Sequence, residues 1–243
     1  MFNLMFCLIL MSSNIALLAK GDSLFALLKY EEALKVYETA YRENSGDYET
    51  LWRLAMVYLS LGEELKDKKV AQKNYDLALN YAKKATKVNP DGDWGWTFFA
   101  AVNGVTALSV GGKEKVKYAM IIKEAVNKAL SINPNNDLAN FIWGSYNFEA
   151  ATLNPMLRSF AKTIFGEVPE GTIENAEKYI KKATLLNPAR IQYHYELARV
   201  YEYQEKIDEA KNTLRKAISL KPQIREDIKY LEKAKKMLQK LEK

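Results

Sequence analysis

One short pattern recurs along the chain and limits its fold more than any other feature. The segments "AKKATKVNP", "VNKALSINP" and "IKKATLLNP" end at Pro90, Pro134 and Pro188, and each has an alanine five residues before the proline. The earlier segment "YEEALKVYETAYRENS" has the same form, with Ser45 in place of the proline. Alanine favours a helix and proline cannot continue one, so each segment reads as the end of a helix. Recurrence of this kind indicates a repeat protein.

The last repeat indicates which kind of repeat this is. The stretch from Ile191 to Pro222 fits the tetratricopeptide pattern, a packed helix pair of about 34 residues. The fit rests on small and bulky residues at the positions where the two helices cross: Leu197, Ala198, Tyr201, Ala210, Leu214 and Ala217. We therefore predict an all-α fold, a tetratricopeptide-like α-solenoid in which helix pairs form a right-handed superhelix.

The spacing of the repeats predicts the domain organisation. Five units start near residues 14, 48, 93, 137 and 191 and occupy residues 20–222. The later units exceed the usual period, and their extra residues keep a helical pattern, which predicts lengthened helices. Residues 223–243 are predicted to form a C-terminal capping helix. The apolar residues expected on one face of it are Ile224, Ile228, Leu231, Leu238 and Leu241.

The stretch "FGEVPEG" at 165–171 raises the question of nucleotide binding. Gly166 and Gly171 have the spacing of a phosphate-binding loop, but Thr172 stands where that loop needs lysine, and a helix is expected before Gly166 instead of a strand. A short helix, "MLRSFAKTIF", follows the break at Asn154–Pro155. We interpret the glycines as a turn and Thr172 as the N-cap of the next helix, and expect no nucleic acid or nucleotide ligand.

The N-terminal residues 1–19 carry no charge, and three interpretations remain open. An apolar run followed by small residues, with a possible cut after Ala19, is typical of a signal peptide. The alternatives are a short membrane anchor and an ordinary first helix of the fold. A cleaved leader predicts export to the periplasm of a bacterium. Otherwise we expect a cytoplasmic or membrane-anchored protein.

Composition argues against most enzyme chemistry. Cys7 and His194 are the single cysteine and the single histidine, so neither a zinc cluster nor an internal disulfide is expected. His194 falls where a bulky residue packs between helices. We expect no catalytic residues, no metal site and no cofactor. Residues 221–243 carry eight basic and four acidic residues. This excess indicates either a solvated helix face or contact with an anionic surface.

The concave face of such a solenoid is lined by fixed positions of the first helix in each unit. These positions predict an aromatic, mostly apolar groove. The residues are Trp52, Met56 and Leu59; Trp94, Thr97, Ala101 and Val105; Phe141, Ser145, Phe148 and Glu149; and Tyr195, Arg199, Glu202 and Tyr203. They either pack against the lengthened helices or form a groove for an apolar peptide, a partner helix or an acyl chain.

From Tyr48 onward the chain resembles the regulator of microtubule dynamics proteins and their bacterial relatives. The segments that carry the resemblance are "LWRLAMVYLSLGEE", "KKATKVNPDGDWGWTFFAAVNGV", "LANFIWGSYNFEAATL" and "RSFAKTIFGEVPEGTIENAEKYIKKATLLNP". The resemblance implies a binding scaffold, because animal members associate with microtubules or organelle membranes and the repeat domain of one holds phospholipid. We therefore expect a protein or peptide partner, with a phospholipid or acyl chain as the alternative.

Overall fold

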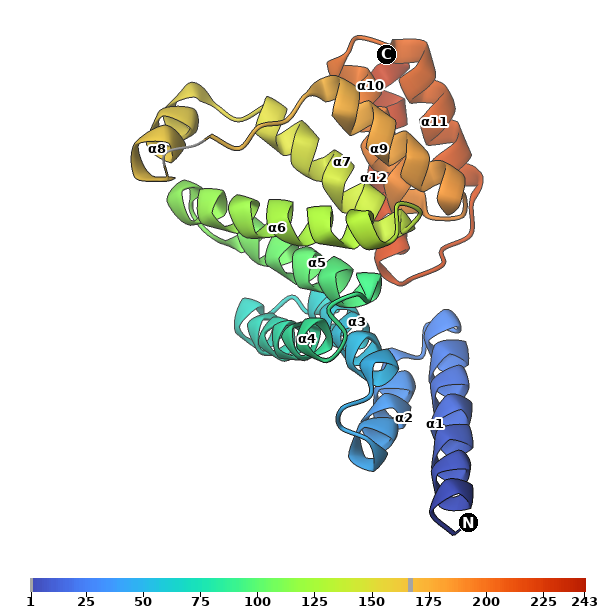
Figure 1. Cartoon of the computed structure of the whole chain (residues 1–243). Helices are drawn as coiled ribbons and strands as arrows, with labels where there is room; N and C mark the ends of the chain where they lie inside the picture. Colours follow the sequence, from blue (N-terminus) through green and yellow to red (C-terminus); the bar gives the residue numbers. More distant parts are fainter. Residues whose placement is uncertain (1, 166–167) are drawn as a thin grey trace. The chain divides into compact units, whose positions relative to one another are not determined.

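The computed structural model describes residues 2–165 and 168–243, and for residues 2–13, 112, 113 and 165 it describes the backbone alone. The described parts are helical (Figure 1). The helices are α1 (Phe2–Ala26), α2 (Tyr30–Glu43), α3 (Tyr48–Glu64), α4 (Lys68–Val88), α5 (Asp93–Ser109), α6 (Gly112–Ile132), α7 (Asp137–Ala151), α8 (Pro155–Phe165), α9 (Ile173–Leu186), α10 (Ile191–Tyr203), α11 (Ile207–Ser219) and α12 (Glu226–Leu241).

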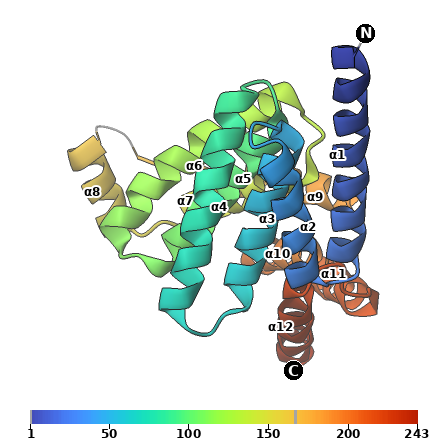
Figure 2. The same cartoon turned by 90° about the horizontal axis from the view of Figure 1, so that it is seen from below.

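The chain divides into two compact units, Met1–Phe98 and Phe99–Lys243, and the division falls within α5. In the first unit α1 packs against α2, and α3 packs against α4 (Figure 2). In the second unit the pairs are α7 with α9 and α10 with α11, and α12 packs on both members of the last pair. The predicted all-α arrangement of helix pairs is therefore present in each unit.

The recurring alanines explain why the helices of a pair approach so closely. Ala40, Ala85, Ala129, Ala183 and Ala217 are all fully buried. A methyl side chain takes up little space at a helix crossing, so the two helices can pack closely there. The asparagine that follows the helix closes it in the same way in four repeats: the backbone N–H of Asn44, Asn89, Asn133 and Asn187 donates to the carbonyl of the alanine four residues earlier.

Polar residues begin several helices at the starts that the repeats predicted. The Asp47 carboxylate accepts from Thr50 N at 2.8 Å before α3, and Asn136 Oδ1 accepts from Ala139 N at 2.8 Å before α7. The predicted N-cap Thr172 accepts from Asn175 N at 3.1 Å before α9. Each cap satisfies one of the free N–H groups of the first helical turn. Gly166 and Glu167, which fall in the predicted turn, lie outside the described residues.

The insert in the fourth repeat forms a helix of its own, α8, as predicted. Its Arg158 guanidinium donates to the carbonyls of Ala150 at 2.7 Å, Ala151 at 3.1 Å and Leu153 at 3.1 Å, the last carbonyls of α7 and the loop after it. A cation at a helix C-terminus also interacts favourably with the helix dipole. One side chain therefore joins the insert to the repeat that carries it.

The N-terminal residues form a longer helix than the repeat pattern predicted. α1 runs from Phe2 to Ala26 without a break at Asn14, and no proline interrupts that stretch. Leu18 is buried, so the helix contributes to the packing of the first unit before Ala19. Cleavage after Ala19 stays a prediction. Among the residues whose side chains the structure describes, a set that leaves out residues 1–13, no helix is long and apolar enough to cross a membrane.

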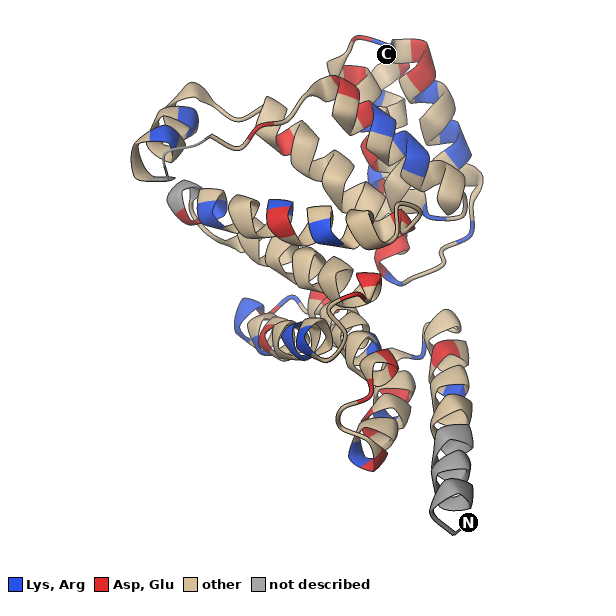
Figure 3. Cartoon of the chain, viewed as in Figure 1, with Lys and Arg blue, Asp and Glu red and all other residues tan. Residues whose placement is uncertain are grey.

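The capping helix α12 packs through most of the predicted apolar face, since Leu231, Leu238 and Leu241 lie against the core cluster that it forms with α10 and α11. Ile228 is 54% exposed, whereas Tyr230, Ala234 and Met237 are buried against α10 and α11. The prediction for Ile228 was wrong because the packed face is centred on Tyr230, Ala234 and Met237, and Ile228 lies outside it. Figure 3 shows basic residues, Lys and Arg together, interspersed with acidic residues in the C-terminal part.

Candidate binding face

In the first unit the structure brings the predicted groove residues Trp52 and Trp94 together. Their rings stack with centroids 5.3 Å apart, and Trp52 also stacks on Phe98 at 5.9 Å. The guanidinium carbon of Arg53 lies 4.1 Å from the Trp52 ring centroid, within the range of a cation–π contact. Met56, on the same helix, is half-buried. This part of the predicted groove is a fixed aromatic stack.

A polar network holds the aromatic stack in place. Arg53 donates from Nε to Asp22 Oδ1 at 2.8 Å and from Nη2 to Asp22 Oδ2 at 2.9 Å. It also donates to Glu49 at 2.6 Å, and the Trp52 indole donates to the same Glu49 oxygen at 3.0 Å. Burial opposes the charge on Arg53, but the hydrogen bonds to Asp22 and Glu49 outweigh it and raise its pKa. The network joins α1 to α3.

Two further predicted groove residues of this unit lie in its interior. Leu59 is buried at 7% exposure, and Thr97 is fully buried, with its hydroxyl donating to the Asp93 carbonyl at 2.8 Å. The hydroxyl is satisfied within its own helix, so it offers nothing to a ligand. Both residues contribute to packing.

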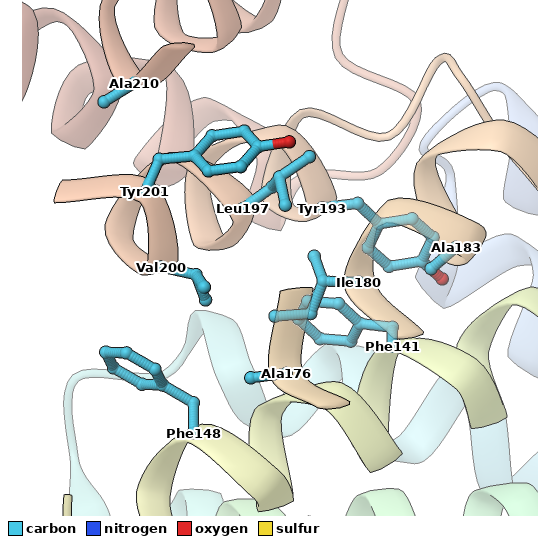
Figure 4. Close-up of a cluster of buried hydrophobic side chains, with 10 residues drawn as sticks. All are labelled: Phe141, Phe148, Ala176, Ile180, Ala183, Tyr193, Leu197, Val200, Tyr201 and Ala210. Atoms are coloured by element: carbon cyan, nitrogen blue, oxygen red, sulfur yellow. The ribbon is translucent and has the colours of Figure 1, made fainter. Parts of the chain in front are cut away.

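In the second unit, Phe141 and Phe148 belong to the core instead of an open groove. Each is 8% exposed, and both contact a cluster from α9 and α10 (Figure 4). The Phe141 ring stacks on Tyr193 at 4.6 Å, and Ile180 lies beside it. The position of these residues within the repeat indicated the correct helix face, but helices α9 and α10 cover that face. Ala101, on α5, is half-buried.

The remaining predicted residues lie on one side of α10, and we call Tyr195, Arg199 and Tyr203 the α10 face. Their spacing of four residues places them in one row along the helix. The Arg199 guanidinium carbon lies 5.2 Å from the Phe148 ring centroid, and Tyr203 meets that ring edge-on at 5.6 Å. Tyr203 is nevertheless 56% exposed. Arg199 and the exposed Tyr203 therefore both pack on the ring of the buried Phe148.

Charged neighbours of the α10 face were not predicted. Arg199 Nη1 pairs with Glu196 at 2.6 Å, and burial raises the pKa of Glu196 against the opposing effect of that arginine. From α12, Lys233 Nζ lies 5.6 Å from the Tyr195 ring centroid and 4.3 Å from that of Tyr230. Glu196 lies on α10 itself, three residues before Arg199, whereas Lys233 lies on α12, more than thirty residues later in the chain. Only Glu196, at a fixed helical spacing from Arg199, carried a signal in the sequence.

His194 is packed in the interior, as the sequence predicted. It is 8% exposed, and its Nε2 lies 2.9 Å from the Pro188 carbonyl. Burial lowers its pKa, which the contact with Pro188 partly opposes. In the part of the chain that the structure describes, no group of three or more His, Cys, Asp or Glu side chains could hold a metal ion.

Comparison with known proteins places this helical arrangement in a family. Residues 17–242 match the family model of regulator of microtubule dynamics protein 1-3. The chain belongs to this family. It is 31% identical over 161 residues to regulator of microtubule dynamics protein 1 of Bos taurus, covering 65% of this chain and 50% of the relative. The corresponding protein of Mus musculus is 30% identical over 176 residues, covering 71% and 56%.

The chain thus spans about half the length of these two curated relatives. Regulator of microtubule dynamics protein 1 of Caenorhabditis elegans is 22% identical, and the match covers 91% of this chain and 98% of the relative. These relatives are animal proteins, and none of them indicates export into a bacterial periplasm, so that location stays a prediction.

The fold prediction is confirmed by a solved structure. A thermophilic TPR protein of Thermus thermophilus matches with a TM-score of 0.65 and 22% identity, covering 93% of this chain and 99% of that chain. The family member described here is therefore a tetratricopeptide-type helical scaffold. We find no observation among its described residues that favours the alternative of a bound lipid.

Proposed function

We propose that this member of the family is a non-enzymatic scaffold that binds a protein or peptide partner on the α10 face. The observation that carries the proposal is Tyr203, an exposed aromatic side chain held edge-on against buried Phe148 beside the Arg199 guanidinium. Tyrosine and arginine are enriched among the residues that dominate binding energy at protein interfaces. A side chain already held in position loses less conformational entropy when a partner binds.

The charges around this face narrow the kind of partner. Glu196 neutralises Arg199, and Lys240 pairs with Glu202 at 3.1 Å, so the centre of the face offers aromatic and aliphatic surface more than free charge. A partner segment would place an apolar side chain against Tyr195 and Tyr203. Polar backbone groups at its edges would reach the surrounding charged side chains. This composition, an apolar centre with a polar rim, is that of ordinary protein interfaces.

The proposal is tested by comparing the partner proteins that co-purify with wild type and with two variants. Tyr203→Ala removes the exposed ring and leaves Phe148 and Arg199 in place. Leu185→Ala, on α9, removes a side chain that is 75% exposed and lies outside the α10 face. Proteins that co-purify with the tagged chain are quantified by mass spectrometry. We expect one or more partners to be retained by wild type and Leu185→Ala but lost with Tyr203→Ala. Equal retention by all three would contradict the proposal.

The names of the relatives suggest one defined candidate partner, the microtubule. Because they are named for the regulation of microtubule dynamics, microtubules assembled from purified tubulin are a reasonable first candidate. Co-sedimentation that weakens with Tyr203→Ala and not with Leu185→Ala would identify them as the partner. Co-sedimentation of all three to the same extent would place microtubule binding elsewhere on the chain.

A further inference from the structure

Lys233, on α12, lies beside the α10 face. Its Nζ is 4.3 Å from the ring centroid of Tyr230 and 5.6 Å from that of Tyr195. Both distances are within the range of a cation–π contact. The two rings also contact each other, with centroids 5.5 Å apart. The packing of α12 on α10 therefore holds one ammonium group at the Tyr195 end of the α10 face.

No acidic side chain pairs with this ammonium group. Among the described residues, the contacts of Lys233 Nζ are the two rings, and neither a hydrogen bond nor an ion pair joins it to a carboxylate. Two other lysines of α12 differ, since Lys235 pairs with Glu232 at 2.8 Å and Lys240 with Glu202 at 3.1 Å. An ammonium group has three N–H donors. Lys233 therefore has donors to offer to an anion.

The charges that face Lys233 do not compensate it. Its charged neighbours are Lys229 and Arg199 on one side of the balance and Glu196 and Glu226 on the other. Glu196 is already paired with Arg199 at 2.6 Å. Burial lowers the pKa of Lys233, Lys229 adds to the effect, and the two carboxylates oppose it. Three cations thus share two carboxylates, and this surface favours the addition of one negative charge.

We propose that Lys233 is a carboxylate-binding subsite of the α10 face, where a carboxylate of the partner segment pairs with the ammonium group while an apolar side chain packs on Tyr203. The inference rests on the proposed function and names the chemistry of the partner. The carboxylate belongs either to an Asp or Glu side chain or to the C-terminus of the partner. Arg199 is not the receptor, because Glu196 already accepts from it.

The length of the α10 face sets the spacing between the two partner groups. Tyr195 and Tyr203 are eight residues apart on one helix, so the two ends of the face are about 12 Å apart at a rise of about 1.5 Å per residue. An extended peptide rises about 3.3 Å per residue, and alternate side chains point to the same side. In an extended partner segment, we therefore expect the carboxylate four residues from the apolar side chain.

Selection from random peptides tests the subsite without a known partner. Peptides of about twelve residues are displayed on phage in two libraries, one attached through the C-terminus and one with the C-terminus free. They are selected on the full chain as wild type, Lys233→Gln and Lys235→Gln. Lys235 lies two residues further along α12, on its opposite side, and its substitution removes the same charge. Wild type and Lys235→Gln should enrich a carboxylate at a fixed distance from an apolar residue, and Lys233→Gln should not.

The affinity of one selected peptide measures the contribution of the pair. The peptide is synthesised with its carboxylate and with the corresponding amide, and binding is measured by calorimetry. Wild type should bind the acidic form about three- to tenfold more tightly, and Lys233→Gln should bind both forms equally. Lys233→Arg, which keeps the charge, should keep the preference. The comparison of the two peptides on wild type does not depend on how well any variant folds.

Two outcomes support the subsite and distinguish the source of the carboxylate. Enrichment of Asp or Glu in both libraries identifies a side chain, and enrichment confined to the library with free C-termini identifies the terminal carboxylate. Three outcomes would overturn the subsite: selected peptides with no carboxylate at a fixed position, no selected peptide at all, or a preference for the acidic form that persists in Lys233→Gln.

The Tyr203→Ala variant separates this inference from the proposed function. Selected peptides that need Tyr203 but bind equally well as acid and amide would remove the carboxylate subsite alone. Peptides that need Lys233 and their carboxylate, but bind Tyr203→Ala as tightly as wild type, would instead leave a carboxylate site on α12 and argue against Tyr203 as the anchor of the α10 face.

Discussion

Arg53 and Asp22 form a two-point ion pair in which both carboxylate oxygens accept from one guanidinium, at 2.8 and 2.9 Å. The Tyr37 hydroxyl donates to the same carboxylate at 2.7 Å. Burial raises the pKa of Tyr37, and the hydrogen bond to Asp22 adds to the effect, so the phenol remains protonated and a donor. One carboxylate thereby connects α1, α2 and α3, and through Arg53 it also supports the stacked Trp52.

Removing that carboxylate should destabilise the first unit. We expect Asp22→Ala to lower its free energy of unfolding by about 1–2 kcal/mol, because Arg53 and Tyr37 lose their acceptor while partial exposure of Asp22 lets water replace part of it. Urea unfolding followed by tryptophan fluorescence measures the change. Glu32→Ala breaks an exposed pair with Lys29 and should stay within about 0.5 kcal/mol of wild type. An equal effect of the two substitutions would argue against a structural role of the network.

A second carboxylate, that of Asp227, should hold the capping helix. Asp227 is fully buried and accepts from the backbone N–H groups of Gln223 at 2.9 Å, Ile224 at 3.2 Å and Gln192 at 3.3 Å. It therefore caps α10 and the turn before α12 together. We expect Asp227→Ala to cost about 2–3 kcal/mol, since it leaves three donors without this acceptor.

Limited proteolysis provides the readout for Asp227. The variant should be cleaved between α11 and α12 faster than wild type, and Asp208→Ala, at an exposed position in the first turn of α11, should not. If Asp227→Ala were as resistant as wild type, the carboxylate would not be needed to dock α12.

Gly144 marks the closest approach between α7 and α9. A Cβ atom at this position would lie 2.5 Å from Ile180 Cγ1 and 2.8 Å from Ile180 N, so one helix must shift to accept it. We expect Gly144→Ala to destabilise the second unit by about 1–3 kcal/mol in chemical denaturation. The matched change is Gly104→Ala on α5, where nothing lies within 4 Å. Because alanine favours a helix, that change should be neutral or stabilising by up to about 1 kcal/mol. Equal behaviour of the two variants would contradict the tight crossing.

The single histidine gives a pH dependence that can be assigned without ambiguity. Burial lowers the pKa of His194 in the folded chain, whereas the unfolded chain has the ordinary value of about 6.5. The unfolded state therefore binds the proton first as the pH falls. Stability contributed by neutral His194 is present above about pH 6.5 and is lost below it, until the folded pKa is reached. The ¹H NMR titration of His194 should give a pKa below 6.5, and a value at or above 6.5 would contradict its burial.

Much of the fold was predictable because its signals are local. Helices α3, α5, α7 and α10 begin at Tyr48, Asp93, Asp137 and Ile191, where a turn and a polar or capping residue interrupt the apolar pattern. The recurring alanines are buried because each lies at a fixed position in its own helix pair. The sequence of one repeat therefore contains the information needed to place them.

The candidate site was less predictable because its contacts join distant parts of the chain. Position within a repeat placed Phe141 and Phe148 on the inner side of α7, but their burial depends on α9 and α10. Lys233 reaches Tyr195 only because α12 packs on α10. The Asp22–Arg53 pair likewise joins residues in different repeats, and neither residue forms a motif by itself.

Site-specific photo-crosslinking tests the central claim, that a partner binds the α10 face, most directly. The photoreactive residue p-benzoylphenylalanine replaces Tyr203 in one protein and Leu185 in the other, since both side chains are more than half exposed. After irradiation in the presence of cell extract, crosslinked peptides are identified by mass spectrometry. The account predicts one recurring partner segment, joined at position 203 through an apolar residue, that is absent from position 185. Crosslinks at position 185 alone, or the same products at both positions, would contradict it.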